Sequence, residues 1–553
     1  MAFACHYNPV FRSQSAKMID TGTLNFLWSQ ALIAGFVAAG AGHAVISPGS
    51  RSTPLALAML RQPGLQCTVA VDERSAAFFA LGVAKASRRP VLLLATSGTA
   101  PANWLPAIIE ASQAGVPLIA ISADRPPELQ NCGANQTIDQ VGLFGSHVRA
   151  SHPLEAPHPG FDPCWLHRLA ARVAEQANWP YPGPVHVNQP FREPLLPAGE
   201  VPAPVLPAGI AFAHSELPAD PTAIARLAES IGGRPGFIVC GELPAKNGLF
   251  SALTALAEHL ACPILAEPLS GLRFGPHPRH RLLTRYNAWL ADREFAASHR
   301  PDWILRFGAF PVTRNLQNFV AAAPIQALVD PWPRHSDPMH RLTHLLRAQP
   351  LAACQALLAA RPQPCPGGWH DALVERDAQP PDIGDAWHIP VLVDAIPEAS
   401  ALFIGNSLAI RQFDTHSGSA RRTIHCYGNR GASGIDGNIS TALGLGEIHG
   451  RIVALLGDLT CQHDLGGLAL ATGRDAVIVA VNNHGGGIFD HLPQAALPEF
   501  ERGWRTPQQI SFEHAAAAFG LSYARADNAA AFRQCLQQAI AAAGPHLLEV
   551  LVA

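Results

Sequence analysis

The sequence predicts an α/β protein built from doubly wound parallel sheets. Short apolar runs alternate with helix-like segments throughout the chain, as expected where helices cover both faces of a parallel sheet. Polar residues directly follow many of these runs, which favours ligand binding at the carboxyl edge of each sheet. Two proline-rich breaks, residues 196–216 and 361–381, separate three α/β segments of similar size. We therefore expect three domains of this kind.

The domain boundaries follow from these breaks. The expected domains cover residues 20–195, 217–355 and 385–553 of the 553-residue chain, which is too long for a single core. Residues 1–19 are expected to be a disordered tail or an extension, with Met18 as an alternative start. A dinucleotide-binding Gly-x-Gly-x-x-Gly motif after a strand was not found in the middle segment.

The composition is that of a globular enzyme. Charged residues make up 15% of the chain and the net charge is −3, which argues against a nucleic-acid partner. Eleven cysteines without a Cys-x-x-Cys pair indicate neither a zinc site nor a disulfide framework. The sequence has no apolar run long enough to cross a bilayer and no recognisable signal peptide. We therefore expect no membrane insertion and a cytoplasmic location.

The first segment alternates strands and helices in a regular way. Helices are expected over residues 75–87 and up to residue 114, and strands over residues 44–46, 67–71, 91–95, 117–122 and 185–187. The middle segment has expected strands near residues 236–240, 263–266, 303–307 and 326–329. The last segment begins with a helix ending at Ile396, continues with a strand over 402–404, and closes with a strand over 547–552.

A βαβ unit in the last segment carries the strongest chemical signal. Apolar runs over residues 452–456 and 476–481 flank a helix-like run over 465–471. The first strand ends in Gly457-Asp458-Leu459 and the second in Asn482-Asn483, so both polar groups lie at one sheet edge. Carboxylate and amide oxygens suit Mg²⁺, which commonly shares its ligand shell with phosphates. The pattern predicts a metal and phosphate site.

The separation of Asp458 and Asn482, 482 − 458 = 24 residues, resembles the thiamine-diphosphate motif. The three-segment organisation likewise resembles the thiamine-diphosphate enzymes of the pyruvate-oxidase-like group. That resemblance implies a pyrimidine-binding domain at 20–195, a central domain at 217–355 and a diphosphate-binding domain at 385–553. In that group each active site combines the pyrimidine-binding domain of one subunit with the diphosphate-binding domain of another, which implies a homodimer or homotetramer.

Seven motifs narrow the resemblance to the 2-succinyl-5-enolpyruvyl-6-hydroxy-3-cyclohexene-1-carboxylate synthases of menaquinone biosynthesis. They are Ser47-Pro-Gly-Ser-Arg-Ser, Thr96-Ser-Gly-Thr-Ala, Ala123-Asp-Arg-Pro-Pro, Gly133-Ala-Asn-Gln-Thr-Ile, Val185-His-Val-Asn-Gln-Pro-Phe-Arg-Glu-Pro, Gly405-Asn-Ser-Leu and Asn429-Arg-Gly-Ala-Ser-Gly-Ile-Asp-Gly. The resemblance implies decarboxylation of 2-oxoglutarate and conjugate addition of the resulting succinic-semialdehyde unit to isochorismate.

The resemblance also assigns cofactor-binding residues. Glu73 would be the catalytic acid that bonds to the aminopyrimidine ring of thiamine diphosphate. The side chains of Asp458 and Asn483, with the carbonyl of Gly485, would hold Mg²⁺ or Mn²⁺. The further cofactor-binding residues it implies are Asn135, Gln136, Ser407, Ile435, Gly457, Leu459, Ile488 and Phe489.

The substrates carry several carboxylates, which arginine can hold in a bidentate manner. The resemblance implies substrate binding by Ser50, Arg51, Arg125, Gln136, Arg314, Asn406, Ser407, Arg411, Arg430, Ile488 and Phe489. One departure concerns a loop of the middle segment where the family often has Lys or Lys-Arg. Here the loop reads Arg314-Asn315, so a second positive charge is missing.

Three other readings stay open at this point. The chain could be another thiamine-diphosphate-dependent 2-oxoacid decarboxylase or an acetolactate-type synthase, although the arginines argue against a small apolar oxoacid. It could be a regulatory protein that lost catalysis, against which Glu73, Asp458 and Asn483 speak. A flavin-containing relative is disfavoured because we found no dinucleotide fingerprint.

Overall fold

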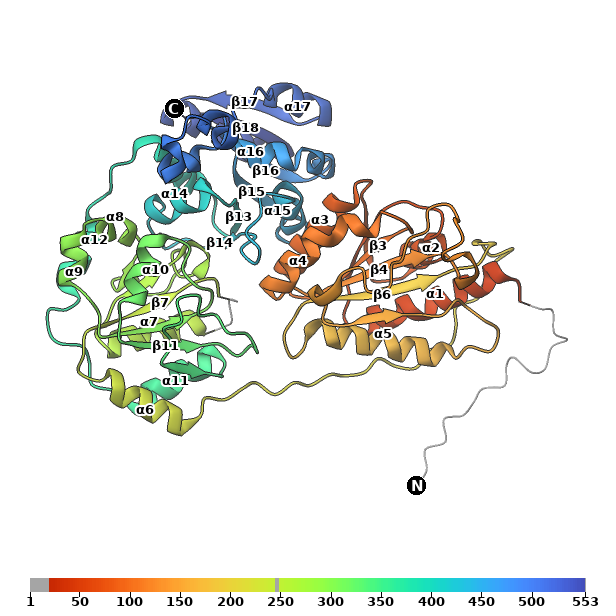
Figure 1. Cartoon of the computed structure of the whole chain (residues 1–553), viewed down its shortest axis with the longest axis horizontal. Helices are drawn as coiled ribbons and strands as arrows, with labels where there is room; N and C mark the ends of the chain where they lie inside the picture. Colours follow the sequence, from red (N-terminus) through yellow and green to blue (C-terminus); the bar gives the residue numbers. More distant parts are fainter. Residues whose placement is uncertain (1–18, 244–247, 553) are drawn as a thin grey trace. The chain divides into compact units, whose positions relative to one another are not determined.

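The computed structural model describes residues 19–243 and 248–552. The predicted fold class is confirmed: the chain forms three six-stranded sheets in which every paired strand is parallel (Figure 1). The expected tail at residues 1–19 lies, except for Ile19, outside the described residues. The chain divides into two compact units, residues up to 84 with 88–212, and residues 85–87 with 213–552. The three-domain division therefore stays a prediction.

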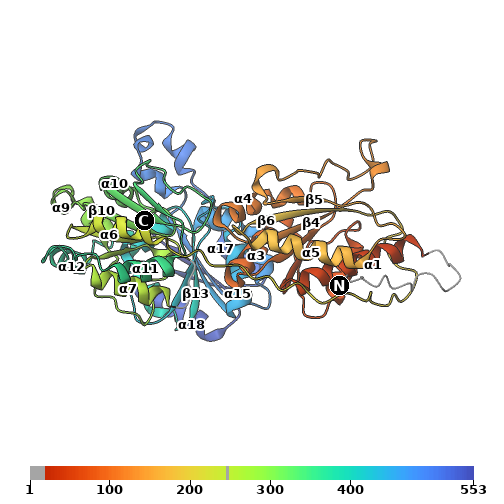
Figure 2. The same ribbon diagram turned by 90° about the horizontal axis from the view of Figure 1, so that it is seen from below.

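The first sheet has the strand order β2-β1-β3-β4-β6-β5. Its strands are β1 His43–Ile46, β2 Gln66–Val69, β3 Val91–Ala95, β4 Leu118–Asp124, β5 Ser151–Pro153 and β6 Pro184–Pro190, and its helices are α1 Thr21–Ala38, α2 Thr53–Arg61, α3 Glu73–Ser87, α4 Leu105–Ala114 and α5 Pro163–Asn178. Right-handed crossovers place α2 and α5 on one face and α3 and α4 on the other. On the first face, α1 lies beside α5 in both views (Figure 1 and Figure 2).

The first sheet differs from the sequence expectation in several details, and helices α1, α2 and α5 were not predicted. Strand β2 ends at Val69, two residues before the predicted end, because Asp72 caps helix α3 by accepting the N–H groups of Arg74 and Ser75. The helix therefore begins at Glu73. Strand β5, which spans three residues, was not predicted. Residues 191–220, all of which the structure describes, form neither helix nor strand and include the predicted linker.

The central sheet has the order β12-β11-β10-β7-β8-β9, which is the dinucleotide-fold order 3-2-1-4-5-6. Its strands are β7 Gly236–Cys240, β8 Ile264–Ala266, β9 Leu282–Leu283, β10 Trp303–Phe307, β11 Ile325–Val329 and β12 His344–Leu346, and its helices are α6 Pro221–Ile231, α7 Leu249–His259, α8 Tyr286–Ala291, α9 Arg293–Ser298, α10 Arg314–Ala321, α11 Pro350–Ala360 and α12 Asp371–Ala378. The four predicted strands are present, whereas β9 and β12, of two and three residues, were not predicted.

Helix α12 corrects the prediction that residues 361–381 are only a break. Its Asp377 is buried and accepts the backbone N–H groups of Thr284 and Arg285 and the indole N–H of Trp289. These bonds attach α12 to the start of α8, so the proline-rich composition flanks an ordered helix.

The last sheet repeats the strand order of the first, in the form β14-β13-β15-β16-β18-β17. Its strands are β13 Ser400–Ile404, β14 Ile424–Tyr427, β15 Arg451–Gly457, β16 Asp475–Asn482, β17 Ser522–Ala526 and β18 Pro545–Leu551, and its helices are α13 His388–Ala395, α14 Leu408–His416, α15 Asn438–His449, α16 Asp458–His463, α17 Phe512–Phe519 and α18 Ala529–Ala542. The predicted βαβ unit is present with β15 and β16 in parallel register. Its helix differs from the prediction, because α16 begins at Asp458 and residues 465–471 form a 3-10 helix, η7.

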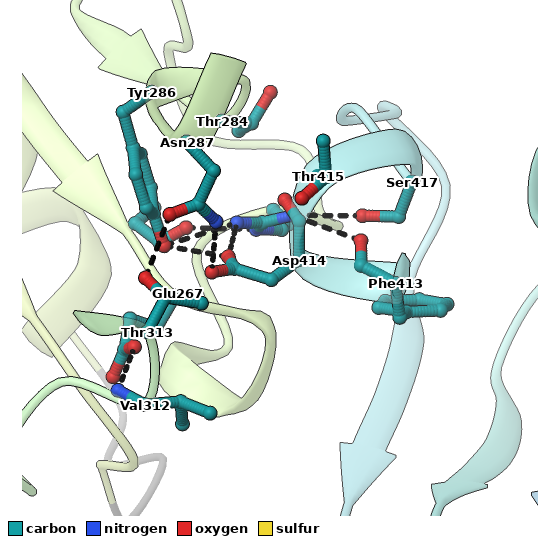
Figure 3. Close-up of polar contacts among 12 residues, drawn as sticks. Glu267, Thr284, Tyr286, Asn287, Val312, Thr313, Phe413, Asp414, Thr415 and Ser417 are labelled. Atoms are coloured by element: carbon teal, nitrogen blue, oxygen red, sulfur yellow. Dashed lines mark hydrogen bonds and ion pairs between the residues drawn. The ribbon is translucent and has the colours of Figure 1, made fainter. Parts of the chain in front are cut away.

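Within the second unit, a buried polar cluster joins the central sheet to the last sheet (Figure 3). Asp414 of α14 is fully buried and accepts bonds from Arg273, from the Tyr286 hydroxyl at 2.6 Å and from the Asn287 amide at 2.5 Å. The Arg273 guanidinium also donates to the carbonyl of Asp414 and to Ser417. Removing one partner of such a buried pair costs about 3–5 kcal/mol, so this cluster fixes α14 against α8.

Glu267 lies in the same cluster and accepts the backbone N–H of Val312 at 2.7 Å. Burial raises the pKa of Glu267 well above its ordinary value, and the Asp414 carboxylate raises this pKa further, against the opposing charges of Arg273 and Arg430. A protonated Glu267 keeps one oxygen for the Val312 N–H, so the folded chain holds a proton that the unfolded chain releases.

We expect Glu267→Gln to flatten the dependence of stability on pH. In the wild type, the folded state binds more protons than the unfolded state between the unfolded pKa of Glu267 and its raised folded pKa. Stability therefore falls as pH rises through that window. Glutamine keeps the acceptor without the charge, so the variant should gain stability over the wild type as pH rises, measured by denaturant unfolding at several pH values.

Glu258→Gln is the matched control. Hydrogen bonds from Arg281 and His280 lower the pKa of the Glu258 carboxylate to about 2, so its contribution is lost only in strong acid and is constant at neutral pH. A pH-independent stability difference for Glu267→Gln, like that expected for Glu258→Gln, would contradict the assignment.

Candidate active site

In the first unit, the predicted residues gather where the strand order reverses, between β1 and β3. The loops after these strands touch: a Cβ added at Gly49 would lie 2.3 Å from the Cβ of Thr96. Only glycine allows this approach. The contact brings the segment of Ser50 and Arg51 against the segment that contains Ser97.

Arg51 is 5% exposed and held at both ends of its guanidinium. It donates to the carbonyl of Phe191 at 2.9 Å and pairs with Glu193 at 2.7 Å. Its Nε is buried without a hydrogen-bond partner. Because Glu193 is 69% exposed, this ion pair is solvent-screened and contributes little to stability, which leaves Arg51 available to an anion.

Arg125 lies close to Arg51, and Gln136 lies beside Ser97. The Arg125 guanidinium donates to the Ser97 hydroxyl at 3.2 Å. Burial, together with the positive charge of Arg51, lowers the pKa of Arg125 below its ordinary value. Gln136 has a positive φ of 55° and donates to the Ser97 carbonyl at 2.9 Å. The structure thus brings together three of the predicted residues of this unit.

A buried amide network supports this edge. Gln140 accepts the backbone N–H of Gly98 at 2.9 Å and donates to Asn188 at 2.8 Å. Asn188 donates in turn to Asp124, which also accepts the backbone N–H of Arg125. The network links β4, β6 and the loop after β3, so it holds Arg125 in place.

The other predicted residues of this unit are more exposed than Arg51. Glu73 is the first residue of α3 and is half-buried, while Ser50 and Asn135 are exposed. Beside Glu73, Val69 and Val71 are 55% and 84% exposed, an unusual exposure for two β-branched apolar side chains so close together.

In the second unit, the site again lies at a strand reversal, between β13 and β15. Asn406 is 3% exposed and donates to the carbonyls of Asn429 and Gly434 at 2.9 and 2.7 Å, and its own oxygen accepts from Arg430 at 2.6 Å. Asn406 therefore ties the loop that carries Arg430 and Ile435 to the end of β13.

Ser407 has φ 65° and ψ −127°, a conformation that almost only glycine adopts. Its carbonyl accepts from Arg411 at 2.7 Å, one turn later in α14. Burial, together with the charge of Arg430, lowers the pKa of Arg411 below its ordinary value. Two predicted arginines thus lie near each other beside a strained residue.

A pocket of about 540 Å³ joins the predicted Arg411 to the predicted Arg314. Its lining residues are Asn287, Ala288, Thr313, Arg314, Asn315, Pro381, Asp382, Arg411, Thr415, His416 and His491. Asn287 donates to Asp414 and accepts from Thr313 at 2.6 Å, so it connects the α14 wall to the start of α10, where Arg314 lies exposed.

Asp458 and Asn483 meet at the ends of β15 and β16. Asp458 is 4% exposed, and its carboxylate accepts the N–H groups of Leu459 at 2.8 Å and Gly485 at 2.7 Å. Burial raises the pKa of Asp458, against the backbone hydrogen bonds. The Asn483 side-chain oxygen is buried without a hydrogen-bond partner. An unpartnered buried carbonyl oxygen near a carboxylate is a donor set that fits Mg²⁺.

The remaining predicted residues of the cofactor site lie in α16, in the 3-10 helix η8, Gly487–His491, and in the loop after β14. Gly457 is the N-cap of α16, and Ile488 and Phe489 belong to η8. Ile435, Leu459, Ile488 and Phe489 are half-buried. The carbonyl of Gly485 accepts the N–H of Gly487 at 2.9 Å.

Sequence reasoning missed the residues that hold the predicted ones. Glu193 and Ser97 lie inside motifs that the sequence analysis identified. The motifs did not indicate that Glu193 pairs with Arg51 or that Ser97 accepts from Arg125. Gln140, Asn287 and Asp414 carry no motif, and their roles depend on tertiary contacts between segments distant in sequence.

Comparison with family models gives two matches. Residues 28–143 match the thiamine pyrophosphate enzyme, N-terminal TPP binding domain, and residues 404–550 match the thiamine pyrophosphate enzyme, C-terminal TPP binding domain. The matches cover β1 to β4 of the first sheet and the last sheet from the end of β13 to β18. The chain therefore carries both thiamine-pyrophosphate-binding domains.

Three curated relatives are named 2-succinyl-5-enolpyruvyl-6-hydroxy-3-cyclohexene-1-carboxylate synthase. They come from Dechloromonas aromatica (62% identical, covering 96% of this chain and 99% of the relative), Geobacillus kaustophilus (39%, 95% and 94%) and Salinibacter ruber (37%, 97% and 95%). Among solved structures, benzoylformate decarboxylase from Polynucleobacter necessarius matches with a TM-score of 0.70 at 18% identity, covering 95% of this chain and 98% of that one. At 18% identity, the likeness to benzoylformate decarboxylase shows the fold alone.

We expect Ser407→Gly to stabilise the protein and Ser407→Ala not to. Glycine relieves a backbone strain of about 1–3 kcal/mol, partly offset by its greater entropy in the unfolded chain. Alanine loses the hydroxyl but keeps the strain, so it separates the two effects. The measurement is the midpoint of thermal unfolding, and an unchanged or lower midpoint for Ser407→Gly would show that the strain is not stored here.

Proposed function

Because the chain belongs to the family of the 2-succinyl-5-enolpyruvyl-6-hydroxy-3-cyclohexene-1-carboxylate synthases, we propose that it decarboxylates 2-oxoglutarate and adds the succinic-semialdehyde unit to isochorismate. The observation that carries the proposal is the relative that is 62% identical over 96% of the chain. The paired arginines at two sheet edges support a reaction between substrates with several carboxylates.

The second unit would hold the diphosphate of the cofactor. Asp458 and Asn483 would bind Mg²⁺ or Mn²⁺ through their side chains, with the carbonyl of Gly485 as a further ligand. The buried, unpartnered oxygen of Asn483 supports this role. When bound, thiamine diphosphate would supply a carbon nucleophile for the keto carbon of 2-oxoglutarate and a cationic thiazolium ring that takes up the electron pair released on decarboxylation. Ile435, Ile488 and Phe489 would enclose the reacting atoms and exclude water.

The first unit would act on the pyrimidine ring. Glu73 would hold a proton at the aminopyrimidine nitrogen, and Gln136 would lie near the same ring. The exposed Val69 and Val71 beside Glu73 support burial of this surface by another chain. We therefore propose a homodimer, or a tetramer of two dimers, in which Glu73 of one subunit serves a cofactor held by Asp458 of another.

The arginines would orient the substrates. Arg51 and Arg125 would hold one carboxylate in the first unit, with Ser50 beside them. Arg411 and Arg430 would hold another in the second unit. Arg314 would replace the lysine that the family often has in this loop, and Asn315 adds no second charge. A carboxylate in the pocket between Arg314 and Arg411 would therefore be held by two cations.

We expect Glu73→Gln to lower turnover by about 10²-fold or more at saturating cofactor, because a positioned acid or base contributes about 10²–10⁴-fold. Circular dichroism should show an unchanged fold. Glu229→Gln is the matched control, since Glu229 is exposed on α6, a helix that carries none of the proposed site residues. Near-native turnover of Glu73→Gln would remove Glu73 from the mechanism.

Product analysis tests the function directly. The protein is incubated with 2-oxoglutarate and isochorismate, with Mg²⁺ and with thiamine diphosphate either added or withheld, and the products are identified by mass spectrometry. The proposal expects carbon dioxide and the coupled product only with the cofactor. A parallel incubation contains pyruvate as the substrate. Carbon dioxide or acetolactate from pyruvate, with no coupled product from 2-oxoglutarate and isochorismate, would instead support the decarboxylase or acetolactate-type alternative.

A further inference from the structure

The glycines after Asn483 leave no room for side chains because another segment of the chain lies against them. A Cβ added at Gly485 would lie 2.2 Å from the carbonyl oxygen of Arg505, and one at Gly486 would lie 2.4 Å from that of Trp504. Gly486 donates its backbone N–H to the Arg505 carbonyl at 2.7 Å. These glycines therefore accommodate the backbone of residues 504–506 of this same chain.

The side chain of Arg505 reaches over the same loop. Its Nη2 donates to the Asn483 carbonyl at 2.6 Å, and its Nη1 forms an ion pair with Asp490 of η8 at 3.3 Å. The side chain is 17% exposed, so the ion pair is partly shielded from water. One guanidinium thus connects the loop of Asn483 with the 3-10 helix that carries Ile488 and Phe489.

A third contact attaches this segment to α16. Gln508 accepts from the Gln462 side chain at 3.0 Å and donates to the Thr506 carbonyl at 2.7 Å. Arg505 also contributes positive charge near Asp458. Residues 504–508 therefore contact both α16, the helix that begins at Asp458, and the loop after β16 that carries Asn483.

We propose that Arg505 is a positioning residue that holds the metal-binding loop and η8 in the geometry required for the cofactor diphosphate. This inference rests on the proposed function. Arg505 acts through Asn483 and Asp490 rather than by touching a substrate. Without it, the Asn483 carbonyl loses its charged donor, and the loop loses the contact that fixes the direction of the Asn483 side chain.

The fork of the guanidinium explains why this position requires arginine. One nitrogen donates a hydrogen bond to a carbonyl, and the other forms an ion pair with a carboxylate, from one rigid plane. A lysine keeps the charge but offers a single nitrogen, so it can satisfy only one acceptor well. Arg505→Lys should therefore lie between the wild type and Arg505→Gln in its effect on cofactor binding.

Isothermal titration of thiamine diphosphate into the full-length protein with Mg²⁺ tests the inference without recourse to turnover. We expect Arg505→Gln to weaken cofactor binding by about tenfold or more, Arg505→Lys by less, and Asp490→Asn by less than Arg505→Gln. Arg502→Gln is the matched control, because Arg502 lies in the same short helix, Glu501–Arg505, and is exposed. The affinity of Arg502→Gln for thiamine diphosphate should equal that of the wild type.

The outcomes separate this inference from the proposed function. If Arg505→Gln is folded by circular dichroism and binds the cofactor as tightly as the wild type, Arg505 has no positioning role, whatever the loss in thermal stability. An equal loss of affinity in Arg502→Gln would show a general effect of charge and also overturn the inference. If the wild type itself fails to bind thiamine diphosphate, the proposed function fails first and the inference fails with it.

Discussion

Where the strand order of a parallel sheet reverses, the connections after the two neighbouring strands lead to opposite faces of the sheet, and this constraint positions the predicted arginines and the proposed metal site. The first and last sheets share one strand order, so the reversal falls between β1 and β3 in one and between β13 and β15 in the other. In the first sheet it places Arg51 near Ser97; in the last it places Asn406 one strand away from Asp458. The strand order therefore determines which loops come together at each site.

The buried cluster around Asp414 fixes the walls of the pocket that Arg314 and Arg411 line. Backbone hydrogen bonds between Ala420 and residues 273 and 275 also join the central part to the last part, whereas apolar packing specifies direction weakly. Arg273 and Asn287 each satisfy Asp414 while binding a second partner, so a shift of α14 would leave a buried charge unpaired. The same helix carries Arg411 on the pocket side. The cost of disturbing the cluster thus keeps the Arg411 wall of the pocket aligned with the start of α10.

The long strands and the site motifs could be predicted from the sequence because their signals are local. Apolar runs such as 91–95 and 476–481 are continuous, and Asp458 and Asn483 follow strands directly. Strands β9 and β12 could not be predicted, since two or three residues carry no periodic pattern. Helix α12 was not predicted because prolines flank it in the sequence. The partners of Arg51, the Phe191 carbonyl and Glu193, lie 140 and 142 residues further along the chain, and a single sequence gives no signal for such pairs.

The arginines occur in pairs whose members disfavour each other's charge. Burial, with the charge of Arg51, lowers the pKa of Arg125 against the opposing charges of Glu193 and Asp124, and burial, with the charge of Arg430, lowers the pKa of Arg411. Partly buried like charges are costly, and folding alone gives no reason to place them at sheet edges. A carboxylate bound between the members of a pair would offset the like charges that burial makes costly. Substrates that carry several carboxylates would therefore complement both arginine pairs better than a monoanionic oxoacid does.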